Sequence, residues 1–275
     1  MYEKPTAPRS IGEVFAQAIR IYKGTGRSTW ILAFALEFVA TVPWLLWQRE
    51  RAPVLSSDLL SGDLLSGELV SGSTLDVLTA LPSSPTVWLA ILIAIPIYGI
   101  LYSALIANVN GIATGQAVSA AGALRRGARL LPRTLLLGFL VIGIVVVGLL
   151  LLLVPGIYWA VSLQLSFIAL VVEDAGVPQS MARSRGLIKG HWGRAATLVS
   201  YVALINLAAY LAVSLITGVV ALIFGAGGSA TSAVSELLSL AADTLVAPLY
   251  PAVFVAMYYD FKSREAAERS MAKAV

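Results

Sequence analysis

The stretch "TLLLGFLVIGIVVVGLLLLLVPGIYWAVSLQLSFIALVV", residues 134–172, decides the fold because it contains no charged residue. A membrane-spanning helix needs about 20 predominantly apolar residues, so this run is too long for one span. Its "VPG" motif includes Pro155, which removes a backbone donor, and Gly156, which permits a tight reversal. We therefore expect two antiparallel spans, at about 133–154 and 156–173, joined by a short turn.

The composition indicates a membrane protein. Hydrophobic residues make up 58% and charged residues 12% of the 275 positions, whereas roughly a quarter of the residues in an ordinary soluble domain are charged. The surplus apolar surface is therefore expected to face lipid. Four further apolar runs are long enough to cross a bilayer, at about 28–48, 87–115, 195–223 and 234–258. We predict an all-α integral membrane protein, a single domain over residues 1–275 with six transmembrane helices arranged as three hairpins.

The positive charges predict the orientation of these spans. All Lys and Arg residues except Arg49 and Arg51 fall within residues 1–27, 116–133, 173–194 or 258–275. Excess Lys and Arg is retained on the cytoplasmic side of a membrane. We therefore expect a multi-pass protein of the cytoplasmic (inner) membrane with its N-terminus and C-terminus in the cytoplasm.

Three of the basic segments have the pattern of short amphipathic helices, at about 10–24, 118–131 and 177–192. Each precedes a hairpin, so the chain is predicted to repeat an interfacial helix followed by two spans. Ser10 and Glu13 have the spacing of a capping box, and Pro132 is expected to end the second helix. Basic side chains can contact anionic lipid headgroups, at about 1 kcal/mol per residue near the surface. The candidates are Arg125, Arg126, Arg129, Lys189 and Arg194.

The segment between the first two spans, residues 49–86, is predicted to be an extracytoplasmic low-complexity loop. It repeats Ser/Gly, an acid and apolar residues with a period of five, as in "SSDLLSGDLLSGELVSGSTL" at 56–75. Regularly spaced acids can indicate calcium, but this spacing does not match an EF-hand. The composition is typical of a solvated linker.

Two carboxyl groups are expected near the membrane midplane, Glu37 in the first span and Asp243 in the sixth. No span contains a Lys or Arg to pair with them, and a carboxylate there costs at least roughly 2.5 kcal/mol. They are expected to be protonated, to face a wet cavity, or to bond to polar neighbours. Candidate neighbours are Asn206, Gln164 and Asn108. The pair either forms a proton or cation site or consists of neutral groups that hold spans together.

The segment after the fourth span contains a candidate latch. Glu173 ends that span, and Arg183 or Arg185 of the following helix can pair with it. The only histidine, His191, lies beside Trp192 at the expected interface, so no multi-His metal site can form. P-loop, HExxH and GxSxG motifs are absent. We expect no enzyme activity, no cofactor and no metal. The basic loops are explained by topology, so nucleic acid is not an expected partner.

Residues 154–192 resemble a group of prokaryotic polytopic membrane proteins that includes YciC-like proteins and the membrane domain attached to some glycerophosphoryl diester phosphodiesterases. The likeness rests on a Pro-Gly turn, a span ending in Glu, a Gly-containing turn and a Ser-bearing basic helix followed by Lys-Gly. Here these are Pro155, Gly156, Glu173, Gly176, Ser184, Lys189 and Gly190. The segment "IGEVFAQAIRIYK", residues 11–23, also resembles the N-terminal helix of that group. The resemblance implies a six-helix integral membrane domain. It does not imply phosphodiesterase activity.

These features leave three hypotheses for the function. The first is a non-enzymatic membrane protein that handles a lipid or another hydrophobic or amphiphilic molecule. The second is a proton- or cation-coupled transporter that uses Glu37 and Asp243. The third is a membrane assembly or scaffold protein that offers its interfacial helices to partners. In each case membrane lipids, including anionic headgroups on the cytoplasmic face, are the expected contacts.

Overall fold

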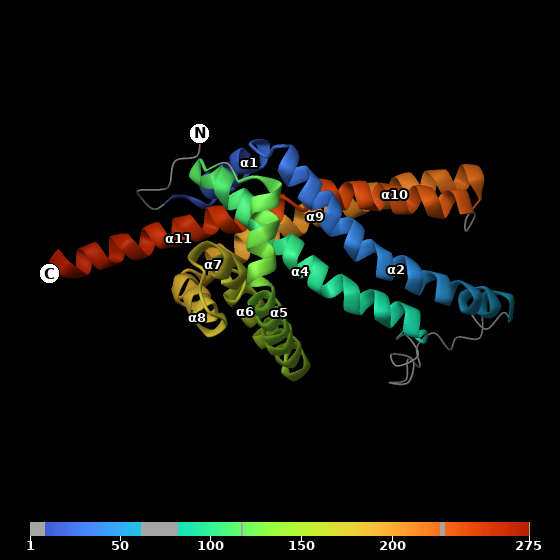
Figure 1. Ribbon diagram of the computed structural model, residues 1–275, viewed down its shortest axis with the longest axis horizontal. Coiled ribbons are helices and arrows are strands. Elements are labelled where there is room, and N and C mark those ends of the chain that lie inside the picture. Colours follow the sequence, from blue (N-terminus) through green and yellow to red (C-terminus); the bar gives the residue numbers. More distant parts are fainter. Residues whose placement is uncertain (1–8, 62–81, 117, 226–228, 275) are drawn as a thin grey trace. The chain divides into compact units, whose positions relative to one another are not determined.

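The computed structural model describes residues 9–61, 82–116, 118–225 and 229–274, and every regular element in these ranges is an α-helix (Figure 1). Six helical segments in the described ranges are long and apolar enough to cross a membrane. The predicted all-α fold with six spans is therefore confirmed. The helices are α1 (Ile11–Lys23), α2 (Arg27–Ser61), α4 (Pro85–Thr114), α5 (Ala120–Leu151), α6 (Leu153–Ser162), α7 (Ser166–Glu173), α8 (Val177–Ile188), α9 (Trp192–Phe224), α10 (Ser229–Val246) and α11 (Leu249–Ala274).

The chain divides into two compact units. The smaller unit, Phe38–Tyr98, contains the later part of α2 and the first part of α4. Within it the Trp88 indole donates to the Pro82 carbonyl at 2.9 Å. The larger unit contains all remaining residues, and it holds every site described below.

The predicted loop 49–86 differs from the structure mainly at its start, whereas its end lies within two residues of the predicted bound. Helix α2 continues to Ser61 and α4 begins at Pro85. Helix α2 contains no glycine and runs through both Pro43 and Pro53. Most of the acidic pentad repeat lies outside the described residues.

Helix α11 forms the core of the larger unit. Its residues Ala252, Val253, Phe254, Val255, Ala256, Met257 and Tyr258 are each at most 3% exposed, as expected for a helical segment that is apolar all round and surrounded by other helices. Helices α1, α7, α8 and α9 pack against it. The predicted single span 234–258 is instead two helices, because the chain turns at Ala247 and Pro248 between α10 and α11. Proline cannot donate the backbone hydrogen bond that would continue α10.

Helix α5 joins the second predicted interfacial helix to the third span without interruption. Pro132 lies inside it and does not end it, contrary to the prediction. Its buried residues Ala123, Gly127, Leu130, Thr134 and Leu137 continue as one stripe across the proline, so packing holds the helix together despite one missing hydrogen bond. At Gly127 a Cβ atom would collide with the Ile100 carbonyl of α4. The two helices can cross this closely because the residue is glycine.

The hairpin of α5 and α6 turns at Leu152, which has an extended backbone. Pro155 lies in the first turn of α6, where its missing N–H has no helical partner to lose. The helices then pack closely, since a Cβ on Gly148 would lie 2.9 Å from the Gly156 Cα. The reversal predicted at "VPG" therefore occurs, displaced slightly toward the N-terminus.

The fourth predicted span, 156–173, is broken in the middle. Helix α6 ends at Ser162 and α7 begins at Ser166, which leaves backbone groups without helical partners. Ser184 of α8 satisfies two of them: its Oγ donates to the Ser162 carbonyl at 2.8 Å and accepts from the Leu165 N–H at 3.1 Å. Ser184 is fully buried. Irregular backbone at membrane depth is tolerated where protein surrounds it, and α8 provides that surrounding.

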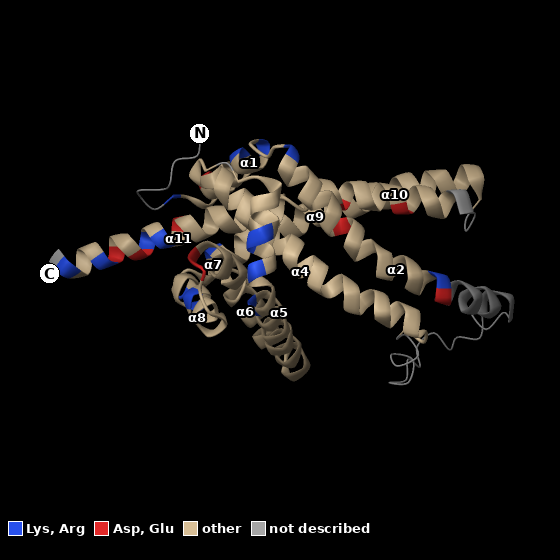
Figure 2. Cartoon of the chain, viewed as in Figure 1, with Lys and Arg blue, Asp and Glu red and all other residues tan. Residues whose placement is uncertain are grey.

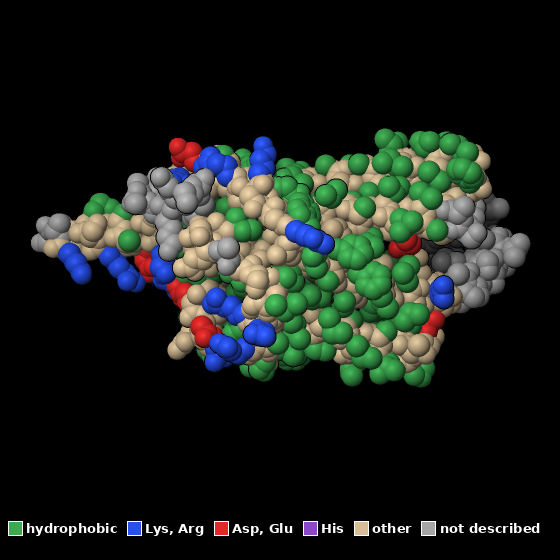
Figure 3. Space-filling model, turned by 45° about the horizontal axis from the view of Figure 1, so that its top comes forward, with side chains coloured by type: hydrophobic (Ala, Val, Ile, Leu, Met, Phe, Trp, Pro, Cys, Tyr) green, Lys and Arg blue, Asp and Glu red, His purple; other side chains and the backbone are tan. Residues whose placement is uncertain are grey.

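Most charged residues of the larger unit lie on α1, α8, α11 and the first half of α5, and a few acidic residues lie on α2, α7 and α10 (Figure 2). Within the larger unit, the space-filling view shows basic side chains near α11 and hydrophobic side chains over much of the remaining face (Figure 3). This separation is what a bilayer requires, since charged groups are costly in hydrocarbon.

The bridge at Ser184 predicts a specific loss of stability. Ser184→Ala removes both hydrogen bonds and leaves a buried carbonyl and a buried N–H unpaired, at about 1–3 kcal/mol each. We expect a clearly lower melting temperature of the detergent-purified protein, measured by scanning fluorimetry. Ser200→Ala on the exposed side of α9 is the matched control, and equal melting temperatures for the two variants would contradict the bridge.

Candidate functional site

An apolar groove lies between α5, α6 and α8. Its volume is about 620 Å³, within the range of about 300–1,000 Å³ typical of small-molecule sites. One charged side chain contributes to the lining: Arg185, whose guanidinium lies 5.8 Å from the centre of the Trp159 ring. The lining residues are Phe139, Leu140, Gly143, Ile144, Val147, Gly148, Leu151, Pro155, Trp159, Leu163, Met181 and Arg185.

This groove has two chemical parts. Its walls can hold an acyl chain or another apolar body, because they consist mainly of aliphatic and aromatic side chains. Arg185 adds a cation, which rests on an aromatic face and can pair with an anionic group. Arg185 therefore does not pair with Glu173, although the sequence placed it among the two candidates for that role. The combination is suited to an amphiphile.

A second, polar cavity of about 400 Å³ lies between α9 and α10. Asp243 and Asn206 both line it, together with Tyr210, Ser214, Thr217, Ser235 and Ser239. The Glu37 carboxyl is close enough to interact electrostatically with Asp243. The Tyr250 hydroxyl interacts electrostatically with both acids. The structure thus brings Glu37, Asp243 and Asn206 into one region.

The other two predicted neighbours of these acids lie elsewhere. Asn108 accepts a hydrogen bond from the Thr29 hydroxyl at 2.7 Å and donates to the Val118 carbonyl at 2.9 Å. It therefore joins α2 and α4 to the segment before α5. Gln164 lies in the break between α6 and α7. Asn108 and Gln164 were predicted as neighbours of the acids from their expected depth in the membrane, but helix packing places them elsewhere.

Glu173 is the centre of an ion-pair cluster at the end of α7, which we name the Glu173 cluster. Its Oε1 lies 3.4 Å from Arg183 Nε and 3.3 Å from Lys262 Nζ, and it accepts a hydrogen bond from the Tyr258 hydroxyl. Arg183 also donates to both carboxylate oxygens of Glu265, at 2.9 and 2.8 Å. The cluster ties α7 and α8 to the core helix α11.

The electrostatics of Arg183 reflect this double pairing. Burial alone lowers the pKa of the guanidinium, but hydrogen bonding and attraction to Glu265, with a further contribution from Glu173, raise it overall. Arg183 therefore stays charged throughout the range in which proteins are stable. Its Nη1 serves both oxygens of Glu265 while its Nε faces Glu173, and lysine has no second nitrogen with which to serve two carboxylates in this way.

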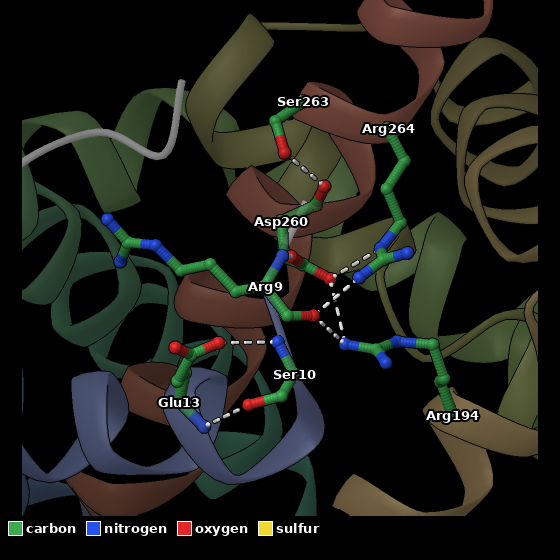
Figure 4. Close-up of polar contacts among 7 residues, drawn as sticks. All are labelled: Arg9, Ser10, Glu13, Arg194, Asp260, Ser263 and Arg264. Atoms are coloured by element: carbon green, nitrogen blue, oxygen red, sulfur yellow. Dashed lines mark hydrogen bonds and ion pairs between the residues drawn. The ribbon is translucent and has the colours of Figure 1, made fainter. Parts of the chain in front are cut away.

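Asp260 of α11 is the centre of a second cluster, which includes the backbone of Arg9, the first described residue (Figure 4). The carboxyl group is almost fully buried and accepts from the Arg9 backbone N–H at 3.0 Å and from Arg264 Nε at 2.9 Å. Arg194 of α9 lies 3.4 Å away, and both it and Arg264 donate to the Arg9 carbonyl. The Arg9 side chain points away, so only its backbone takes part. This arrangement fixes the entry to α1.

The capping box at the start of α1 continues this junction. Ser10 Oγ accepts from the Glu13 N–H, and Glu13 Oε2 accepts from the Ser10 N–H at 2.7 Å. The hydrogen bond from the Ser10 backbone lowers the pKa of the Glu13 carboxyl. Because a depressed pKa stabilises the folded state only while the group is ionised, this contribution is lost as pH falls through the folded-state pKa.

The predicted headgroup contacts fall into two groups. Arg125, Arg126 and Arg129 line a pocket of about 450 Å³ with Gly122, Leu130 and Asp174, and Lys189 is exposed after α8. Arg194 is a correction: its guanidinium is engaged by Asp260 and the Arg9 carbonyl inside the protein. A buried carboxylate needs a nearby cation, so the Arg194 guanidinium is directed to Asp260, although 21% of its side chain stays exposed.

Asp260, Tyr258, Glu265 and Asp174 were not singled out from the sequence. The signal available for Asp260 was its i,i+4 spacing to Arg264 directly after the last apolar run. Nothing local indicates that Tyr258 or Glu265 faces α7 and α8, because those contacts join residues more than 80 positions apart.

Comparison with known proteins identifies relatives of this chain. A model described as an uncharacterised protein family, UPF0259, matches residues 82–240. A UPF0259 membrane protein of Sodalis glossinidius (strain morsitans) is 38% identical over 88 residues, which cover 32% of this chain and 35% of that protein. The match thus spans about a third of the relative's length. No solved structure matches the chain.

The Glu173 cluster generates a stability prediction. Glu173→Gln keeps the side-chain shape but removes the charge that Arg183 and Lys262 share, and we expect a loss of about 1–2 kcal/mol, discounted for partial exposure. Amide hydrogen exchange should increase specifically in α8. Glu268→Gln, on the exposed part of α11, is the control with the same chemistry. Unchanged exchange in α8 would rule out the latch.

Proposed function

This chain belongs to the uncharacterised membrane protein family UPF0259, and from that premise we propose that it is a non-enzymatic protein of the cytoplasmic membrane that handles a lipid or another amphiphilic molecule. The observation that supports the proposal is the apolar groove between α5, α6 and α8, with Arg185 in its lining. We further propose that both termini are cytoplasmic. The basic helices α1 and α8 both pack against α11, and excess Lys and Arg is retained on the cytoplasmic side of a membrane. We also propose that the chain is related to YciC-like proteins and to the membrane domain attached to some glycerophosphoryl diester phosphodiesterases.

The groove is suited to this role because of where its residues come from. Helices α5 and α6 form an antiparallel hairpin within apolar segments, so a lipid chain can enter without crossing an aqueous layer. Helix α8 carries basic residues and supplies Met181 and Arg185. Methionine adapts its shape to irregular apolar partners. The site therefore adjoins both environments that an amphiphile requires.

A second candidate function is favoured by the polar cavity between α9 and α10. Its carboxyl, amide and hydroxyl groups are oxygen-rich ligands of the kind that bind protons and hard cations. Intramembrane acids are functional-site hypotheses by default. A proton- or cation-coupled transporter would use Asp243 and the nearby Glu37 at this position.

Filling the groove tests the first proposal. A Cβ on Gly143 meets no atom within 4 Å, so Gly143→Trp should place its ring in the groove and displace the ligand. We expect fluorescent phospholipid binding to the purified protein to weaken by about tenfold or more, equivalent to about 1.4 kcal/mol. Gly218→Trp on α9 is the matched control, because its Cβ also meets no atom within 4 Å. Equal phospholipid binding in both variants would refute the groove as the lipid site.

Neutral isosteres test the transporter alternative. Glu37→Gln and Asp243→Asn preserve shape and remove the titratable groups, so each should abolish pH-driven cation flux in proteoliposomes. Glu236→Gln on α10, outside the cavity lining, should retain flux. Absence of flux in the wild-type protein, or full flux in both carboxyl variants, would eliminate the alternative.

A further inference from the structure

Three arginines converge on one pocket at the start of α5. Arg125, Arg126 and Arg129 line it, and Asp174 is the one acidic residue in the lining. Asp174 is already paired, since Arg133 NH1 lies 2.9 Å from its Oδ1. The pocket therefore has an excess of positive charge, which favours an anionic ligand.

Arg126 is held by a contact with the backbone, whereas Arg125 and Arg129 lie on an exposed face of α5. Arg126 donates to the Val171 carbonyl of α7, which fixes the pocket against the end of the fourth span. Arg125 and Arg129 are exposed and lie one helical turn apart on α5, so their side chains extend from the same face. A phosphate fits this arrangement, because guanidinium groups bind its oxygens through paired hydrogen bonds.

The pocket and the apolar groove lie along one face of the same helix. Arg129 lines the pocket, and Leu140 and Val147 line the groove. At about 100° per residue, an offset of 11 positions falls about 20° from whole turns and an offset of 18 positions completes five turns. The rise from Arg129 to Leu140 is about 17 Å. One elongated amphiphile can therefore reach both sites along α5.

We propose that Arg125, Arg126 and Arg129 bind the phosphate group of the amphiphile whose apolar part occupies the α5–α6–α8 groove. This inference rests on the proposed lipid-handling function and adds a ligand class to it: a molecule with an apolar tail and a phosphate. The same arginines recognise phosphate whether it comes from a lipid headgroup or from free inorganic phosphate. The two sources are separated by experiment.

The test uses the full chain purified in detergent and two probes, fluorescent phosphatidic acid and inorganic phosphate. The double variant Arg125→Gln/Arg129→Gln should weaken phosphatidic acid binding by about tenfold or more, because two of the three charge-assisted contacts are lost. Arg126 is kept because it also supports α7. The control Arg20→Gln/Lys23→Gln removes the same charge from exposed positions on α1 and should bind like the wild type. Equal weakening in both double variants, or none in the first, would overturn the phosphate site.

Competition and a phosphate-free probe complete the design. Millimolar inorganic phosphate that does not displace phosphatidic acid supports a lipid headgroup as the source, whereas displacement supports a site that also accepts free phosphate. Fluorescent diacylglycerol reports on the groove alone: it should be lost in Gly143→Trp and retained in Arg125→Gln/Arg129→Gln. Retention of diacylglycerol binding together with unchanged phosphatidic acid binding in the arginine variant would sink this inference and leave the groove standing.

Discussion

Burial of the Asp260 carboxylate is the constraint on which the larger unit depends. An ionised carboxyl group taken from water costs several kcal/mol unless nearby donors compensate, and here they come from three parts of the chain. The Arg9 backbone, Arg194 at the start of α9 and Arg264 one turn along α11 all converge on it (Figure 4). This junction holds the entry to α1 against α11, on which α1 packs. The residues that follow then bury Val14, Ala18 and Ile21.

The break between α6 and α7 leaves backbone groups that α8 must hydrogen-bond. Its free backbone groups need partners, and Ser184 supplies them from a helix that also carries charged residues. Helix α8 is consequently attached at two levels: by Ser184 to the broken span and by Arg183 to Glu173 and Glu265 of α7 and α11. The same attachment places Met181 and Arg185 beside α6. The groove thus results from satisfying backbone groups, and its cation comes with the helix that does so.

The six spans could be predicted from the sequence because hydropathy determines them. The break in the fourth span and the partner of Arg194 could not, because contacts between distant segments determine them. The six spans follow from run length, because a bilayer enforces about 20 apolar residues per crossing. The break at 163–165 has no such signal, since Leu163, Gln164 and Leu165 are compatible with a continuous helix. Arg194 was expected at the headgroups because basic residues near a span commonly lie there. Its partner Asp260 lies 66 positions away, and no local pattern connects them. Glu173 and Arg183 were paired in advance because only a short turn separates their helices.

The distribution of burial shows where stability comes from. Phe139, Leu150 and Leu222 are 77%, 81% and 87% exposed, so the apolar hairpins α5–α6 and α9–α10 present much of their surface to lipid. In a bilayer such surface gains little from packing against another apolar helix, because lipid tails are equally apolar. The hairpins therefore rely on close contacts, such as Gly148 against Gly156. Specific polar contacts concentrate instead on α1, α8, α9 and α11 at the Asp260 and Glu173 clusters. Close glycine contacts therefore fix the spacing within a hairpin, whereas the two polar clusters fix how α1, α8 and α9 attach to α11.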